Sequence, residues 1–222
     1  MNKFISILLL LYVVSSCVEG PKDEKEQIKE QVLPFYGPKE LEVKEVKGEK
    51  VKDTIYHKIP PFAFLNQDSV LIRNVDVEGH IYVADFFFTH CPSICPTMTK
   101  QMKRLSENTQ DIPELMFLSH TIDPKRDTLK RLKQYRDEMG IDNVNWHFLR
   151  GTMDYTYDIG KNGYLINADE DEDAEGGYLH SEHFVLVDRY GHIRGMYEGT
   201  DPDKVDQLES DIRKLIKEEY GE

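Results

Sequence analysis

One apolar run constrains the fold more than any other feature of the sequence. Residues 81–88 (Ile-Tyr-Val-Ala-Asp-Phe-Phe-Phe) are rich in β-branched and aromatic side chains, and the run is long enough for a strand buried on both faces. It leads directly into residues 91–96 (Cys-Pro-Ser-Ile-Cys-Pro), after which Met98, Met102 and Leu105 recur at helical spacing. A buried strand that is followed at once by a helix predicts an α/β domain.

Strand and helix patterns alternate along the rest of the chain. Ahead of the central strand, residues 60–65 and 68–75 predict an opening hairpin or edge strand. The elements expected after the first helix are a strand at Glu114–Ser119, a helix at Thr128–Met139, a hairpin at Phe184–Asp188 and Ile193–Tyr197, and a final helix from Pro202. This order is the thioredoxin arrangement, so we predict a thioredoxin-like α/β fold with a central mixed sheet flanked by helices.

Charge and cysteine count exclude some classes of protein. The 222 residues include 28 Lys and Arg against 41 Asp and Glu, a formal net charge of −13. This acidic excess argues against a protein that binds the phosphates of a nucleic acid. The three cysteines are too few for a disulfide-stapled miniprotein, and their odd number indicates that one of them has a separate role.

The N-terminus predicts export and a lipid anchor. Residues 1–16 resemble a signal peptide, because the apolar run 4–14 falls short of the roughly 20 residues that span a bilayer. The run ends in Val-Ser-Ser-Cys, which resembles the lipobox of bacterial lipoproteins, with the lipid on Cys17. The alternative is a plain secretory signal with a chance cysteine. We expect a membrane-anchored lipoprotein whose domain faces the periplasm or the cell exterior, where disulfides can form.

A charged segment separates the signal from the predicted domain. Residues 17–55 interleave Lys and Glu and have few apolar side chains, so we interpret them as a polar tether. Within this segment, residues 41–44 (Leu-Glu-Val-Lys) alternate apolar and charged side chains, which predicts an edge strand lying against the domain. The thioredoxin-like domain is then expected at residues 56–222.

Cys91 and Cys95 form a CxxxC motif between the central strand and the next helix. If the first turn is helical, side chains at i and i+4 share one face and can converge on one atom. A helix N-terminus also favours the thiolate, which is both the nucleophilic and the metal-binding form of cysteine. The spacing alone fits a structural disulfide, a thiol–disulfide enzyme, or a metal site with at least one further ligand.

His180 is the strongest candidate for that further ligand among eight histidines. It follows the loop 167–178 and precedes a predicted hairpin strand, a junction that faces the cysteine loop in a thioredoxin-like fold. Thioredoxins carry a cis-proline there, whereas this chain has no proline between Pro124 and Pro202. Two thiolates and an imidazole suit copper as Cu(I) or Cu(II), while a structural zinc site would need a fourth ligand. His183 is the nearest alternative ligand.

Several neighbouring residues have structural interpretations. Met98 and Met102 are expected in the core rather than on copper, because they share one helix face. Asp85 is expected to be a buried polar group near the cysteines. Asp123-Pro124 and Asp127-Thr128 predict a turn and an N-cap for the second helix, and Arg126 is expected to pair with an acidic neighbour or to position the loop.

Four motifs resemble the Sco/SenC family of copper proteins, which serve cytochrome c oxidase assembly. They are, in chain order, residues 85–96 (Asp-Phe-Phe-Phe-Thr-His-Cys-Pro-Ser-Ile-Cys-Pro), 121–128 (Thr-Ile-Asp-Pro-Lys-Arg-Asp-Thr), 146–151 (Trp-His-Phe-Leu-Arg-Gly) and His180-Ser181 ahead of 185–188 (Val-Leu-Val-Asp). The resemblance covers roughly residues 56–220. It implies a thioredoxin-like fold that binds one copper ion through Cys91, Cys95 and His180.

The resemblance also implies a copper chaperone rather than an enzyme. The ion would come from an upstream copper donor and pass to the subunit of cytochrome c oxidase that bears the CuA centre. Oxidation of Cys91 and Cys95 to a disulfide would release it. Two alternatives stay open. One is a thiol–disulfide reductase whose redox pair, Cys91 and Cys95, acts on cysteines of the oxidase copper site. The other is a redox or copper sensor.

Overall fold

The computed structural model describes residues 32–46, 49–166, 169–170, 178–179 and 181–221. They belong to one compact unit, Val32–Glu222. The predicted signal, the predicted lipid attachment site Cys17 and the predicted ligand His180 lie outside the described residues. Within the described ranges, none of the helices combines the length and the apolar character that crossing a membrane would require.

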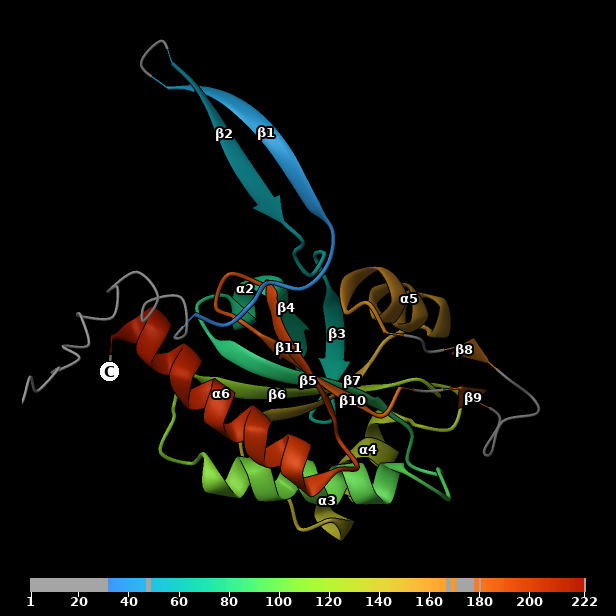
Figure 1. The fold of residues 1–222 in the computed structure, drawn as a ribbon. Helices are drawn as coiled ribbons and strands as arrows, with labels where there is room; N and C mark the ends of the chain where they lie inside the picture. Colours follow the sequence, from blue (N-terminus) through green and yellow to red (C-terminus); the bar gives the residue numbers. More distant parts are fainter. Residues whose placement is uncertain (1–31, 47–48, 167–168, 171–177, 180, 222) are drawn as a thin grey trace, which may run out of the picture. The chain divides into compact units, whose positions relative to one another are not determined.

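Seven strands form a mixed sheet at the centre of this unit (Figure 1). Their order is β11-β10-β5-β6-β7-β3-β4, with β5–β6 and β6–β7 parallel and the other pairs antiparallel. The bounds are β3 Ala63–Asn66, β4 Leu71–Arg73, β5 Ile81–Phe87, β6 Leu115–Thr121, β7 Trp146–Arg150, β10 His183–Val187 and β11 Ile193–Glu198. Every residue of β5 is buried, so the central strand predicted from the apolar run is confirmed.

Helices cover both faces of this sheet. Figure 1 shows α3, α4 and α6 on one side and α5 on the other. The bounds are α2 Asn74–Val77, α3 Cys95–Asn108, α4 Leu129–Glu138, α5 Met153–Asp158 and α6 Pro202–Tyr220, and a π-helical turn, η1 Ile159–Gly163, follows α5 directly. The mixed α/β architecture with flanking helices is the predicted one.

The predicted helices begin at the residues that their capping signals indicate. The Thr128 side chain accepts a hydrogen bond from the Arg131 backbone at the start of α4, and Asp201 caps α6 in the same way. Pro202 occupies the first turn of α6, where its missing N–H has no intrahelical partner to lose.

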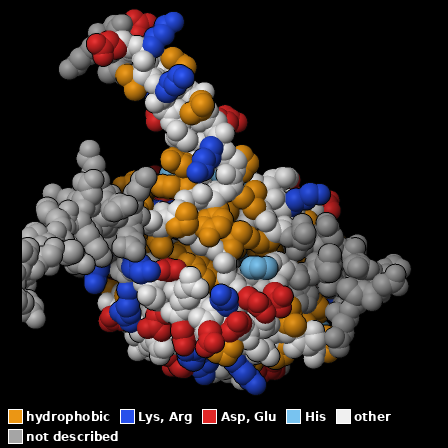
Figure 2. Space-filling view, viewed as in Figure 1, with side chains coloured by type: hydrophobic (Ala, Val, Ile, Leu, Met, Phe, Trp, Pro, Cys, Tyr) orange, Lys and Arg blue, Asp and Glu red, His pale blue; other side chains and the backbone are white. Residues whose placement is uncertain are grey.

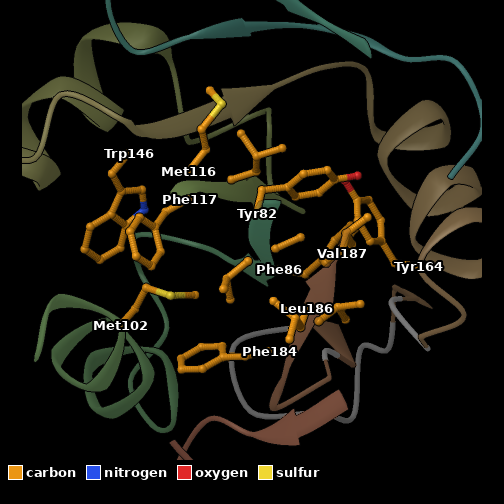
Figure 3. Close-up of a cluster of buried hydrophobic side chains, with 14 of the residues drawn as sticks. Tyr82, Phe86, Met102, Met116, Phe117, Trp146, Tyr164, Phe184, Leu186 and Val187 are labelled. Carbon is orange, nitrogen blue, oxygen red and sulfur yellow. The ribbon is translucent and has the colours of Figure 1, made fainter. Parts of the chain in front are cut away.

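The core lies between the sheet and these helices. Met102 from α3 packs near Phe117 and Trp146 on one side of the sheet, while Tyr82 and Tyr164 meet on the other (Figure 3). Met98 and Met102 are both buried in this core, as their helical spacing predicts.

The charged segment ahead of the domain folds differently from the prediction. Residues 41–44 do form part of a strand, β1 (Lys39–Val46), but it does not join the edge of the central sheet. It pairs instead with β2 (Glu49–Tyr56) in an antiparallel sheet of its own. Figure 2 shows apolar, basic and acidic side chains along this hairpin. The strand register divides its apolar side chains between the two faces: Leu41 and Val43 lie opposite Thr54 and Lys52 on one face, while Val51 and Ile55 lie opposite Lys44 and Glu40 on the other. Neither face therefore carries the continuous apolar row that packing on the domain would need.

Candidate metal centre

The two cysteines of the CxxxC motif lie where β5 gives way to α3. Cys91 follows the C-terminal end of β5 in a tight loop, with its backbone N–H bonded to the Phe88 carbonyl at 3.3 Å. Cys95 is the first residue of α3. Neither cysteine is in a disulfide and both are buried, with 7% exposure at Cys91 and 1% at Cys95. The loop therefore positions both cysteine side chains just beneath the protein surface.

A hydrogen bond joins the two thiols. This bond to Cys91, together with burial, raises the pKa of the Cys95 thiol well above its usual value, while a backbone hydrogen bond from Phe88 acts in the opposite direction. Two sulfur atoms that share a hydrogen bond are close enough to bind one metal ion or to form a disulfide. The absence of a disulfide in this arrangement leaves both sulfurs available as soft donors.

A buried polar chain lies beneath the pair, on the α3 side of the sheet. The Asp85 carboxylate on β5 accepts a hydrogen bond of 2.5 Å from the Ser119 hydroxyl on β6, and the Trp146 indole N–H donates to the same hydroxyl at 2.8 Å. Burial raises the pKa of Asp85 to about 7. Asp85 is also among the charges that raise the Cys95 pKa, which agrees with its predicted place near the cysteines.

The loop that follows β6 holds the cysteine loop from the side. Because β5 and β6 are parallel, both loops leave the same edge of the sheet. The fully buried Asp127 carboxylate accepts hydrogen bonds from the Thr89 backbone N–H at 3.1 Å and from the Thr121 hydroxyl at 2.6 Å. Arg126 forms an ion pair with the buried Asp123, which is the acidic neighbour that the sequence predicts for it. The sequence predicts only a place for Asp127 at the start of the second helix, and its bonds to Thr89 were not predicted.

The histidines around the site differ in how they are held. His90, directly before Cys91, has a half-exposed ring near Thr89 and Asp127. His183 starts β10 and shares a 2.8 Å hydrogen bond with the Ser181 hydroxyl. Among the described residues, no three His, Cys, Asp or Glu side chains form a group that could hold a metal ion. The described part of the site thus supplies two thiols, and its third ligand, His180, stays a prediction.

Comparison with known proteins places this arrangement in a family. A family model described as SCO1/SenC matches residues 51–217. The chain belongs to the SCO1/SenC family. The SCO1 protein homolog of Bacillus subtilis is 28% identical over 170 residues, which are 75% of this chain and 86% of the relative.

Solved structures of SCO1/SenC proteins share the fold. A SCO1/SenC family lipoprotein from Bacillus anthracis matches with a TM-score of 0.66 at 28% identity, over 72% of this chain and 95% of that protein. BsSco is a member of the Sco family of cytochrome c oxidase assembly proteins in which a disulfide switch has been identified. It matches with a TM-score of 0.65 at 27% identity, over 72% of this chain and 93% of that protein. Copper-bound ScoI of Bradyrhizobium japonicum has the same fold. It matches with a TM-score of 0.59 at 19% identity, over 70% of this chain and 98% of that protein.

Proposed function

We propose that this protein is a copper chaperone that binds one copper ion through Cys91, Cys95 and His180 and supports maturation of the CuA centre of cytochrome c oxidase. The observation that carries the proposal is the pair of buried thiols that share a hydrogen bond at the end of β5 in a SCO1/SenC chain. Family members with copper bound and with a disulfide switch support both halves of it, metal binding and redox coupling.

The chemistry follows from the thiols. Copper is the cargo, and it binds the thiolate forms, so loading displaces the thiol protons of Cys91 and Cys95 to solvent. Burial of the pair excludes competing water, and an imidazole from His180 would complete a three-ligand site suited to both oxidation states. A two-electron oxidant that joined the sulfurs in a disulfide would remove two ligands at once and release the ion.

The setting of the proposed function is the outer face of a membrane. Cys17 would carry the lipid anchor on the periplasmic or exterior side. The SCO1/SenC relative from Bacillus anthracis is a lipoprotein, which supports this anchor. The partners would be an upstream copper donor and the oxidase subunit that bears CuA. Residues 18–31 would separate the anchor from the described unit.

Titration of the reduced protein with Cu(I) and Cu(II), followed by absorption spectra, tests the ligand set. We expect about one copper per monomer and a loss of affinity in Cys91→Ala and His180→Ala that exceeds the roughly 10–100-fold effect of removing a supporting residue. Cys17→Ser and His183→Ala are the matched controls, since each removes a similar group outside the proposed set. Unchanged copper binding in His180→Ala would rule out the three-ligand site.

A thiol–disulfide reductase is the second candidate, favoured by the same hydrogen bond between Cys91 and Cys95. The reduced pair would attack a disulfide in the oxidase copper site, become oxidised and leave two thiols on the partner. The purified protein should then reduce a CuA-site disulfide with metal chelated, and His180→Ala should leave the rate unchanged. For a sensor, deletion of the protein would leave oxidase activity intact in copper-poor and copper-replete growth.

A further inference from the structure

The two residues that precede Cys91 belong to a network that ends on a buried carboxylate. The Thr89 hydroxyl oxygen lies 2.5 Å from Oδ1 of Asp127, 3.0 Å from Nδ1 of His90 and 3.1 Å from Nε of Arg131. Asp127 is fully buried, whereas the His90 side chain is 48% exposed. A longer contact of 3.7 Å joins His90 Nδ1 to Asp127 Oδ1.

The protons in this network have only one arrangement. A hydroxyl has one proton to donate and two lone pairs to accept with. The Asp127 carboxylate only accepts, so the Thr89 proton points to Asp127, and the Arg131 guanidinium only donates, so it uses one lone pair of Thr89. The remaining lone pair meets Nδ1 of His90, which therefore carries a proton. In the neutral ring, Nε2 is then an unprotonated lone pair.

An imidazole held through Nδ1–H by an acceptor chain from a carboxylate is the form in which histidine usually binds metals. Nε2 of His90 makes no hydrogen bond within the described residues. Exposure falls stepwise from the half-open His90 ring to Cys91 at 7% and Cys95 at 1%. Cys91, the residue after His90, is therefore the more exposed of the two thiols.

We propose that His90 is a further copper ligand, which binds the ion through Nε2 together with Cys91 on the solvent side of the thiol pair. This inference rests on the proposed copper function and adds a side chain to it. Imidazole nitrogen and thiolate sulfur together suit Cu(I). On uptake the Nε2–Cu and Sγ–Cu bonds form as the bonds to the donor's ligands break. The Cys91 thiol proton goes to solvent, and copper keeps its oxidation state.

Long-range ¹H–¹⁵N spectra of the reduced protein labelled with ¹⁵N-histidine test the inference directly. Before copper is added, His90 should show the Nδ1–H tautomer. On addition of one equivalent of Cu(I) to the His180→Ala variant, the His90 Nε2 signal should shift. His192 should not move, although a carboxylate, Asp188, also holds its Nδ1 at 3.2 Å. It lies between β10 and β11, at the opposite end of the sheet from Cys91.

Substitution of His90 provides a second readout. His90→Asn keeps an N–H donor near the Thr89 hydroxyl but removes the Nε2 lone pair, so the loop stays held while the ligand is lost. We expect Cu(I) exchange with a small competing chelator to slow by about tenfold in His90→Asn, with no change in His192→Asn.

The outcomes separate this inference from the proposed function. A proton on Nε2 of apo His90, or a His90 signal that stays fixed while copper–thiolate absorption grows, would overturn the inference and leave the chaperone proposal standing. If thiolate absorption failed to grow while Nε2 shifted, the three-ligand function would fail, and so would the proposed pairing of His90 with Cys91. If neither changed, both would fail.

Discussion

His120 illustrates how a single buried residue sets the pH range in which the fold is stable. Its ring is fully buried on β6, stacked 5.0 Å from Phe86 and edge-on to Phe64 at 4.8 Å, and neither ring nitrogen has a hydrogen-bond partner within the described residues. Burial lowers the pKa of His120 to about 3. The folded protein therefore keeps this ring neutral, whereas the unfolded chain protonates it below about pH 6.5.

The sign of the pH effect follows from this difference. Between about pH 6.5 and 3 the unfolded state binds a proton that the folded state does not, so the free energy of unfolding falls as the pH falls. His120→Phe should remove this contribution, which we estimate at roughly 3 kcal/mol between about pH 7 and pH 4. Urea unfolding at several pH values measures it. Equal pH slopes in the wild type and His120→Phe would contradict the assignment.

Residues of the site differ in how far the sequence could predict them. The place of Cys91 and Cys95 between the central strand and the next helix follows from the sequence, while their spacing alone leaves the chemistry open. The bonds of Asp127 to Thr89 do not, because the two residues are 38 positions apart and meet only when parallel strands bring their loops together. The tautomer of His90 requires the positions of three partner side chains, which no local pattern contains.

Elements with their own start and stop signals were predictable. The helix α4 has its N-cap at Thr128 and ends before Gly140, whose positive φ of 61° suits glycine. By contrast, α5 and η1 are short and were not predicted, since their residues lack a sustained apolar period. They are fixed by packing instead: the Phe86 ring lies so near Gly160 of η1 that an added Cβ would come within 3.2 Å of it.

A buried arginine ties the N-terminal segment to β11. The Arg194 guanidinium is 1% exposed, donates to the Leu33 carbonyl at 2.7 Å and to Glu218 at 2.7 Å, and lies over the Phe35 ring at 4.3 Å. It also pairs with the buried Asp188 at 3.3 Å. No local sequence pattern predicts this cluster, because its members come from three distant segments.

Loss of Arg194 should be costly. Arg194→Met would leave buried carboxylates without their partner, and we expect a loss of about 3–5 kcal/mol in the free energy of unfolding, measured with denaturant. Arg213→Met is the matched control, since Arg213 also pairs with carboxylates but is 40% exposed, and it should cost less than about 1 kcal/mol. Similar losses in the two variants would show that burial of the Arg194 cluster is unimportant.

At the scale of the molecule, the β1–β2 hairpin is separable from the central sheet. Its residues are mostly exposed. The His57 backbone N–H donates a hydrogen bond to the Pro38 carbonyl at 3.2 Å, so the two ends of the hairpin lie next to each other. Glu42 and Asp53 face each other across the strands. Replacing residues 43–52 by Asn-Gly should close a two-residue turn between them.

The shortened hairpin should leave the fold intact. We expect a melting temperature within about 4 °C of the wild type, corresponding to less than about 1 kcal/mol, and unchanged copper binding. Thermal unfolding followed by circular dichroism measures this. A large drop in melting temperature would indicate that the hairpin stabilises the unit that carries the cysteines.

The charges of the whole molecule bear on solubility rather than on the metal centre. Figure 2 shows acidic and basic side chains interspersed over the face that carries α3 and α6, where Arg104 pairs with Asp206 and Arg213 with Asp111. A net charge of −13 keeps the chain soluble, while exposed pairs contribute little stability. The thiols, by contrast, lie inside the surface.

The central claim is that the buried thiol pair binds copper. Its most direct test is Cu(I) titration of the reduced protein against a competing chelator, with copper–thiolate absorption recorded for the wild type, Cys91→Ala, Cys95→Ala and the control Cys17→Ser. We predict about one tightly bound copper in the wild type and Cys17→Ser, and loss of both the absorption and the tight binding in either variant of the pair. Tight copper binding that survived in Cys91→Ala and Cys95→Ala would contradict the claim.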